Sequence, residues 1–105
     1  MAKLSLTPNP TFEAAVKIHV PGGSRVPVKF VFRHRNRASV KVLWEEVKDG
    51  KHSDVELVMQ LACGWELDDE FNADNVGLLV DSYAGAAGEI LDTYFRELAG
   101  AREGN

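Results

Sequence analysis

The chain's clearest helix start lies within residues 61–83, which read LACGWELDDEFNADNVGLLVDSY. Asn72 belongs to the residue types that cap helix N-termini, because its side-chain oxygen can accept a hydrogen bond from a free backbone N–H group. Phe71 and Val76 stand one residue before and four residues after this cap, the spacing at which two apolar side chains pack across a helix start. The spacing predicts a helix over residues 73–83.

Apolar residues recur at helical spacing on both sides of this start. The residues before it that share the spacing are Val55, Val58, Met59, Ala62 and Trp65. Those after it are Val76, Leu79, Val80 and Tyr83. An acidic run over residues 66–70 separates the two sets. We therefore predict a helix, a sharp acidic corner and a second helix, with Trp65 and Phe71 on the inside of the corner.

Residues 12–35 show the period-two alternation that is typical of strands. The first run has one apolar side, formed by Phe12, Ala14, Val16, Ile18 and Val20. The second run also has one, formed by Val26, Val28, Phe30 and Phe32. Residues 21–24 between the runs have the composition of a turn, so we predict a β-hairpin with one apolar and one charged face. Pro27 lacks a backbone N–H, so we expect an open edge near the start of the second strand.

A two-stranded hairpin is only marginally stable alone, so its apolar face needs a cover. Apolar stripes at helical spacing predict four short helices, which span about residues 38–48, 53 or 54–62, 73–83 and 86–99. The expected fold class is α+β: an N-terminal β-hairpin covered by about four short C-terminal α-helices. We expect the second helix to be the most buried, because it carries a second apolar stripe.

The length and composition favour one domain. The chain has 105 residues, of which 45% are hydrophobic, an ordinary fraction for a globular protein. We expect an extended lead-in over residues 1–11, a single α+β domain over 12–100 and a frayed tail over 101–105. Within the domain, the hairpin takes residues 12–35 and the helical part takes 38–100.

The composition also excludes several protein classes. No apolar run approaches the roughly 20 residues that a membrane span needs. The first residues lack the layout of a signal peptide. The one cysteine, Cys63, cannot form an internal disulfide, which favours a reducing cytoplasm.

The charge is distributed unevenly along the chain. The formal net charge is −4, but residues 1–48 hold nine Lys/Arg against three acids and residues 49–105 hold three against thirteen. A chain with two ends of opposite charge favours head-to-tail contact between copies, or a charged partner at one end.

No residue pattern predicts catalysis or a metal site. The three histidines and Cys63 lack zinc-ligand spacing, and the acidic corner lacks the Gly and the bidentate Glu of a calcium loop. Cys63 is expected to be a buried, inert thiol at the end of an apolar helix. The chain contains no nucleophile elbow and no phosphate-binding loop. We therefore expect a protein without catalytic residues, cofactor or metal.

Two surface features point to binding. Arg33, Arg35 and Arg37 form a basic cluster that could meet the phosphates of a nucleic acid, dock a protein, or lie in a solvated connection. The aromatic residues Trp44, Tyr94 and Phe95 lie on short helices of a small domain, so they could form an apolar face left open for a partner, or belong to the core.

Residues 57–98 resemble the tail assembly chaperones of long-tailed bacteriophages and prophages. The resemblance rests on Gly64-Trp65, Phe71-Asn72, Leu78-Leu79, Tyr83, Ile90, Tyr94 and Leu98. The two strand-like runs fit the strand-rich front of the same family. One departure is Ala84, where the family often has proline after the aromatic residue.

The resemblance implies a non-enzymatic chaperone that binds and solubilises the tape-measure protein and helps recruit tail-tube subunits. Such proteins act in the cytoplasm of the bacterial host and are absent from the mature virion, and many are also made as a longer frameshifted form. The alternatives are a structural tail or head-completion protein that stays in the virion, and a small nucleic-acid-binding regulator that uses the arginine cluster.

Two hypotheses assign residues to these contacts. The client-binding surface would comprise Trp44, Tyr94 and Phe95. A homo-oligomer would form where the arginines of one copy meet the acidic corner of the next, a contact that involves Arg33, Arg35, Arg37, Glu66, Asp68, Asp69 and Glu70.

Overall fold

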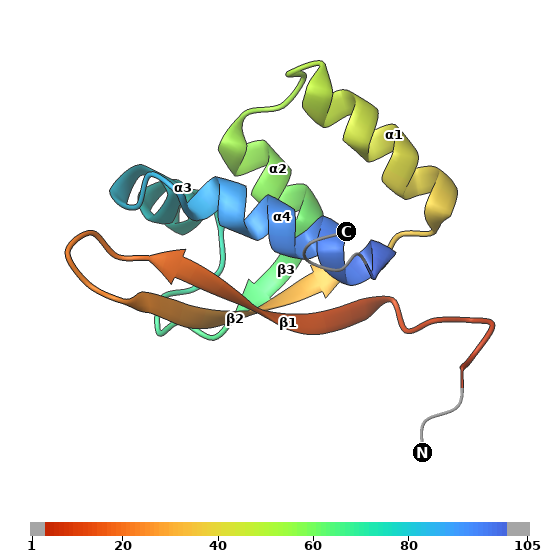
Figure 1. The fold of residues 1–105 in the computed structure, drawn as a ribbon, viewed down its shortest axis with the longest axis horizontal. Coiled ribbons are helices and arrows are strands. Elements are labelled where there is room, and N and C mark those ends of the chain that lie inside the picture. Colours follow the sequence, from red (N-terminus) through yellow and green to blue (C-terminus); the bar gives the residue numbers. More distant parts are fainter. Residues whose placement is uncertain (1–3, 101–105) are drawn as a thin grey trace.

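The computed structural model describes residues 4–100 and has three strands and four helices in that range (Figure 1). In chain order these are β1 (Thr11–His19), β2 (Arg25–Arg33), α1 (Arg37–Lys48), α2 (Asp54–Leu61), β3 (Ala62–Trp65), α3 (Ala73–Ser82) and α4 (Ala86–Ala99). The helices gather on one side of the sheet, so the predicted α+β class is confirmed. The expected frayed tail, residues 101–105, lies outside the described residues.

The hairpin forms as predicted. β1 and β2 pair antiparallel, from Thr11 opposite Arg33 at one end to His19 opposite Arg25 at the turn. The alternating apolar residues face the helices, and Val16, Phe30 and Phe32 have no exposed surface. The alternating polar residues lie on the opposite, open face of the sheet.

β3 is a third strand where the sequence pattern predicted the end of a helix. The prediction that Ala62 and Trp65 continue the helix is wrong: α2 ends at Leu61, and Ala62 takes an extended backbone conformation. β3 pairs antiparallel with β2, which gives the backbone of β2 hydrogen-bond partners on its second side. Gly64 favours this outcome because glycine is a poor helix former. The sheet order is β1-β2-β3.

β3 covers only part of its neighbour. It pairs with Phe30 to Phe32, and one further hydrogen bond joins Glu66 N–H to the Lys29 carbonyl oxygen at 2.9 Å. In the described part of the chain, no strand pairs with this side of β2 nearer the turn, where Pro27 lies. The open edge predicted from Pro27 is therefore present.

The helix starts agree with their sequence signals. The Asn72 side chain accepts a hydrogen bond from Asn75 N–H at 2.8 Å and begins α3 as predicted. Ser53 and Glu56 form a reciprocal capping box at the start of α2. Asn36 caps α1 in the same way as Asn72 caps α3.

The core lies between the sheet and the helices. α4 crosses the sheet and contributes Ile90 and Tyr94, both without exposed surface. α2 buries three residues, consistent with its two apolar stripes. α1 buries only Leu43, and α3 buries only Val76. None of the helices within residues 4–100 is long and apolar enough to cross a membrane.

Candidate protein-interaction sites

The acidic corner is held by aromatic side chains. Trp65 and Phe71 meet edge to face with ring centroids 5.1 Å apart, and Trp65 Nε1 donates a hydrogen bond to the Asp69 carbonyl oxygen at 2.8 Å. Asn75 Nδ2 donates to the Glu70 carbonyl oxygen at 2.7 Å. The two aromatic residues therefore meet at the inside of the corner as predicted, and both are half-buried.

The backbone hydrogen bonds of the corner leave its carboxylates in solvent. We call residues 66–70 the acidic loop, and all five are exposed. Within residues 4–100, the one ion pair of this loop joins Glu66 to Lys29 at 3.5 Å. The carboxylates of Asp68, Asp69 and Glu70 are thus available to a charged partner.

An apolar groove lies beside this loop, between α3 and the turn end of the hairpin. Its volume is about 410 Å³. The residues that line it are Ile18, Val20, Val26, Val28, Trp65, Leu67, Asp69, Asn75, Leu78, Leu79, Ser82 and Tyr83. Three of them are substantially exposed for apolar residues: Val26 at 46%, Leu67 at 37% and Leu78 at 63%. Its lining is mainly apolar, and the sequence analysis did not predict this groove.

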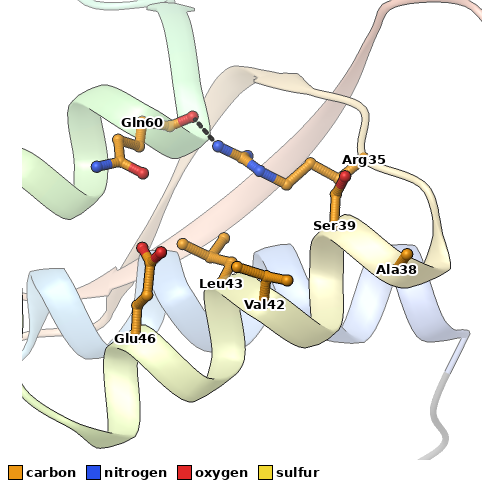
Figure 2. A pocket seen from close by; sticks show the side chains of 7 residues that line it. All are labelled: Arg35, Ala38, Ser39, Val42, Leu43, Glu46 and Gln60. Atoms are coloured by element: carbon orange, nitrogen blue, oxygen red, sulfur yellow. Dashed lines mark hydrogen bonds between the residues drawn. The ribbon is translucent and has the colours of Figure 1, made fainter.

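The arginine cluster divides into an internal and an external part. Arg35 Nη1 donates a hydrogen bond to the Tyr94 hydroxyl at 2.7 Å. Its Nη2 donates to the Gln60 carbonyl oxygen at 3.1 Å (Figure 2). Arg35 is therefore half-buried and bonded within the fold, and it has no part in the contacts proposed below. Arg33 and Arg37 are exposed.

Tyr94 is likewise internal. Its side chain has no exposed surface, and its hydroxyl donates a hydrogen bond to the Arg33 carbonyl oxygen at 2.7 Å. Burial raises the pKa of this hydroxyl above its ordinary value of 10.0, and the hydrogen bond and positive charge of Arg35 offset part of the rise. Tyr94 is covered in this structure, unlike the open face that the hypothesis assumed, so the client-binding surface proposed below does not include it.

The other two aromatic residues of that hypothesis remain together. Trp44 of α1 meets Phe95 of α4 edge to face, with ring centroids 5.2 Å apart. Trp44 is 46% exposed and Phe95 is half-buried, resting on Tyr94 with centroids 5.6 Å apart. The Trp44–Phe95 pair is therefore an accessible apolar surface that packs on the buried Tyr94.

A second cleft, of about 340 Å³, lies between α1 and α2 (Figure 2). Its lining includes two charged side chains, Arg35 and Glu46. Arg35 is bound to Tyr94 and Gln60, and Glu46 Oε1 lies 2.7 Å from His52 Nε2. Both charged side chains therefore have partners within the fold, and we interpret the cleft as a structural gap between two helices.

Cys63 differs from its prediction. It was expected to be buried in a helix, but it lies on β3 and is exposed, because a strand turns alternate side chains to opposite faces. No group of three or more potential metal ligands (His, Cys, Asp or Glu) occurs among residues 4–100.

Comparison with known proteins agrees with a protein-binding role. The family model for phage tail assembly chaperones matches residues 1–105, the whole chain. The chain belongs to this family, and the predicted resemblance is confirmed. Searches of curated proteins and of solved structures gave no match.

Proposed function

We propose that this chain is a non-enzymatic chaperone that binds the tape-measure protein, keeps it soluble in the host cytoplasm and helps recruit tail-tube subunits around it. Membership of the tail assembly chaperone family supports the class of function. The observation that carries the binding proposal is the accessible Trp44–Phe95 pair. The chaperone would leave the assembly before the virion is complete.

The Trp44–Phe95 pair suits an apolar client. Tryptophan and phenylalanine supply large apolar area with few rotatable bonds, so little conformational entropy is lost on binding. α1 buries only Leu43, so the position of Trp44 can adjust to different client segments while Phe95 stays fixed on Tyr94. This combination favours binding at several places along one long apolar chain.

Binding can be tested by co-purification of the tape-measure protein with a tagged copy of this chain. Trp44→Ala should reduce the recovered client about tenfold or more, since truncating a buried aromatic anchor typically costs 2 kcal/mol or more. Val42→Ala is the matched control, because Val42 is 58% exposed on the same helix but lines the α1–α2 cleft. Equal recovery with both variants, each folded, would contradict the proposed surface.

Self-association through opposite charges is a second part of the proposal. Arg33 lies at the end of β2 opposite Thr11, whereas the acidic loop runs from Glu66 towards the turn end of the sheet. Arg33 and Arg37 of one copy would meet Asp68, Asp69 and Glu70 of the next. Arg35 has no part in this contact, because its guanidinium is bound inside the fold.

Charge reversal tests this contact. Arg33→Glu combined with Arg37→Glu should abolish the oligomer at low salt, because attraction between exposed charges becomes repulsion. Arg33→Lys combined with Arg37→Lys should preserve it. An unchanged elution profile after charge reversal would contradict the contact.

A further inference from the structure

The segment before the hairpin carries the two most exposed large apolar residues among those described. Leu4 is 94% exposed and Leu6 is 95% exposed. We call residues 4–10 the N-terminal arm, and it projects away from the sheet and the helices (Figure 1). The two leucines lie two positions apart, so burying both against a partner would remove a substantial apolar area from water.

The arm has a defined shape. The Ser5 hydroxyl donates a hydrogen bond to the Thr7 carbonyl oxygen at 2.9 Å and accepts one from Thr7 N–H at 3.2 Å. Pro8 and Pro10 restrict the following backbone, and His34 N–H donates to the Pro10 carbonyl oxygen at 2.8 Å. A segment held in this way loses less entropy on binding than a flexible one.

The apolar groove has the complementary properties. It is lined mainly by aliphatic side chains, and Leu78 and Val26 at its edges are exposed. The acidic loop borders it and contributes Asp69 to the lining. The arm itself carries no charged residue, and Lys3, which precedes it in the sequence, supplies a positive charge that would complement Asp69 of the groove.

The arm and the groove lie at opposite ends of the hairpin. The arm joins β1 at Thr11, opposite Arg33, whereas Val20 and Val26 line the groove beside the turn. The arm also runs away from the turn end of the sheet (Figure 1). The arm therefore does not lie in the groove of its own copy, and the occupant we infer is the arm of a second copy.

We propose that Leu4 and Leu6 of one copy bind in the groove between α3 and the hairpin of the next copy, forming an apolar joint in a head-to-tail chain. This proposal rests on the self-association proposed above. Arg33 stands at the arm's base, opposite Thr11, and the acidic loop stands beside the groove, so the apolar joint and the charged contact form together. Because the arm and the groove lie on different parts of each copy, every bound copy leaves one of them free, and further copies can be added one after another.

Two complementary variants test the joint in the full-length protein. The arm variant, Leu4→Ser with Leu6→Ser, keeps an intact groove, and the groove variant, Leu78→Ser, keeps an intact arm. Sedimentation velocity should show concentration-dependent assemblies for the unmodified protein and monomers for each variant alone. An equimolar mixture of the two variants should form a one-to-one dimer that grows no further, since only one joint can form.

Each leucine removed from the groove should weaken association about tenfold to a hundredfold. The assemblies should persist at about 0.5 M salt, where contacts between exposed charges are screened. Persistence at this salt concentration therefore separates the apolar joint from the charged contact. Val42→Ser is the matched control, because Val42 is exposed outside the groove, and it should assemble like the unmodified protein.

A synthetic peptide of residues 1–10 should bind the arm variant with one-to-one stoichiometry in calorimetry and should not bind the groove variant. Variants that assemble like the unmodified protein, a mixture that stays monomeric, or a peptide that binds both variants equally would overturn the joint. The client proposal is measured separately by recovery of the tape-measure protein with Trp44→Ala.

Discussion

The Tyr94 hydroxyl accepts a 2.7 Å hydrogen bond from Arg35, which joins the last helix to the segment that follows the hairpin. The same hydroxyl donates to the Arg33 carbonyl oxygen at 2.7 Å. Tyr94 thus joins α4 both to the last residue of β2 and to the segment between β2 and α1. Arg35 also donates to Gln60 of α2. A short polar network in an otherwise apolar interior thus sets how α2 and α4 sit relative to β2.

Tyr94→Phe should lower the free energy of unfolding by about 1–3 kcal/mol, because it removes the acceptor for Arg35 Nη1 and the donor to the Arg33 carbonyl oxygen. Urea denaturation measures the change. Tyr83→Phe is the matched control: Tyr83 is half-buried, its hydroxyl makes no hydrogen bond within residues 4–100, and its removal should change the free energy by less than about 0.5 kcal/mol. Equal effects for the two variants would contradict the network.

The raised pKa of Tyr94 predicts an alkaline loss of stability. Below about pH 10 the hydroxyl is protonated in both the folded and the unfolded chain, and its contribution to stability is complete. Above that pH the unfolded chain loses the proton first, so stability falls as pH rises towards the folded pKa. The urea midpoint of the unmodified protein should therefore fall more steeply between pH 9 and 11 than that of Tyr94→Phe. Parallel curves would contradict the assignment.

Asn72→Ala should destabilise the protein by about 1 kcal/mol, because it removes the acceptor for the 2.8 Å bond from Asn75 N–H at the start of α3. Asn72→Asp should restore most of the loss, since aspartate caps helices equally well. Thermal or urea unfolding measures both variants. A full loss with aspartate would show that the cap is not the cause.

Cys63 should react with an aromatic disulfide reagent in the native protein at a rate near that of the denatured protein, because it is exposed on β3. The reaction is followed by absorbance, with urea-unfolded protein as the reference. A thiol that reacts only after unfolding would favour the helix that the sequence pattern predicted and would contradict β3.

The elements with strong local signals could be predicted from the sequence. Period-two alternation located the hairpin, and the cap residue Asn72 located the start of α3. These signals depend on residues close to one another in the sequence, so they can be recognised from a single sequence. The same holds for Trp65 and Phe71, which are six residues apart and meet at the acidic corner.

β3 and the roles of Arg35 and Tyr94 depend on distant partners. The four residues of β3 form a strand because β2 offers an unpaired edge 30 to 35 positions earlier in the sequence. Arg35 stands in a run of basic residues that is typical of a protein surface, but its side chain hydrogen-bonds to the buried Tyr94, 59 residues away. The groove exists only because α3 packs beside the turn end of the hairpin, which no local pattern specifies.

The central claim is that this chain keeps the tape-measure protein soluble during assembly. The most direct measurement is the soluble fraction of that client when it is expressed alone, with the unmodified chain, and with Trp44→Ala. The account predicts an insoluble client alone, a soluble complex with the unmodified chain, and a large loss of soluble client with Trp44→Ala at equal expression. A client that stays insoluble beside the unmodified chain, with this protein found instead in purified virions, would contradict the account and favour a structural tail component.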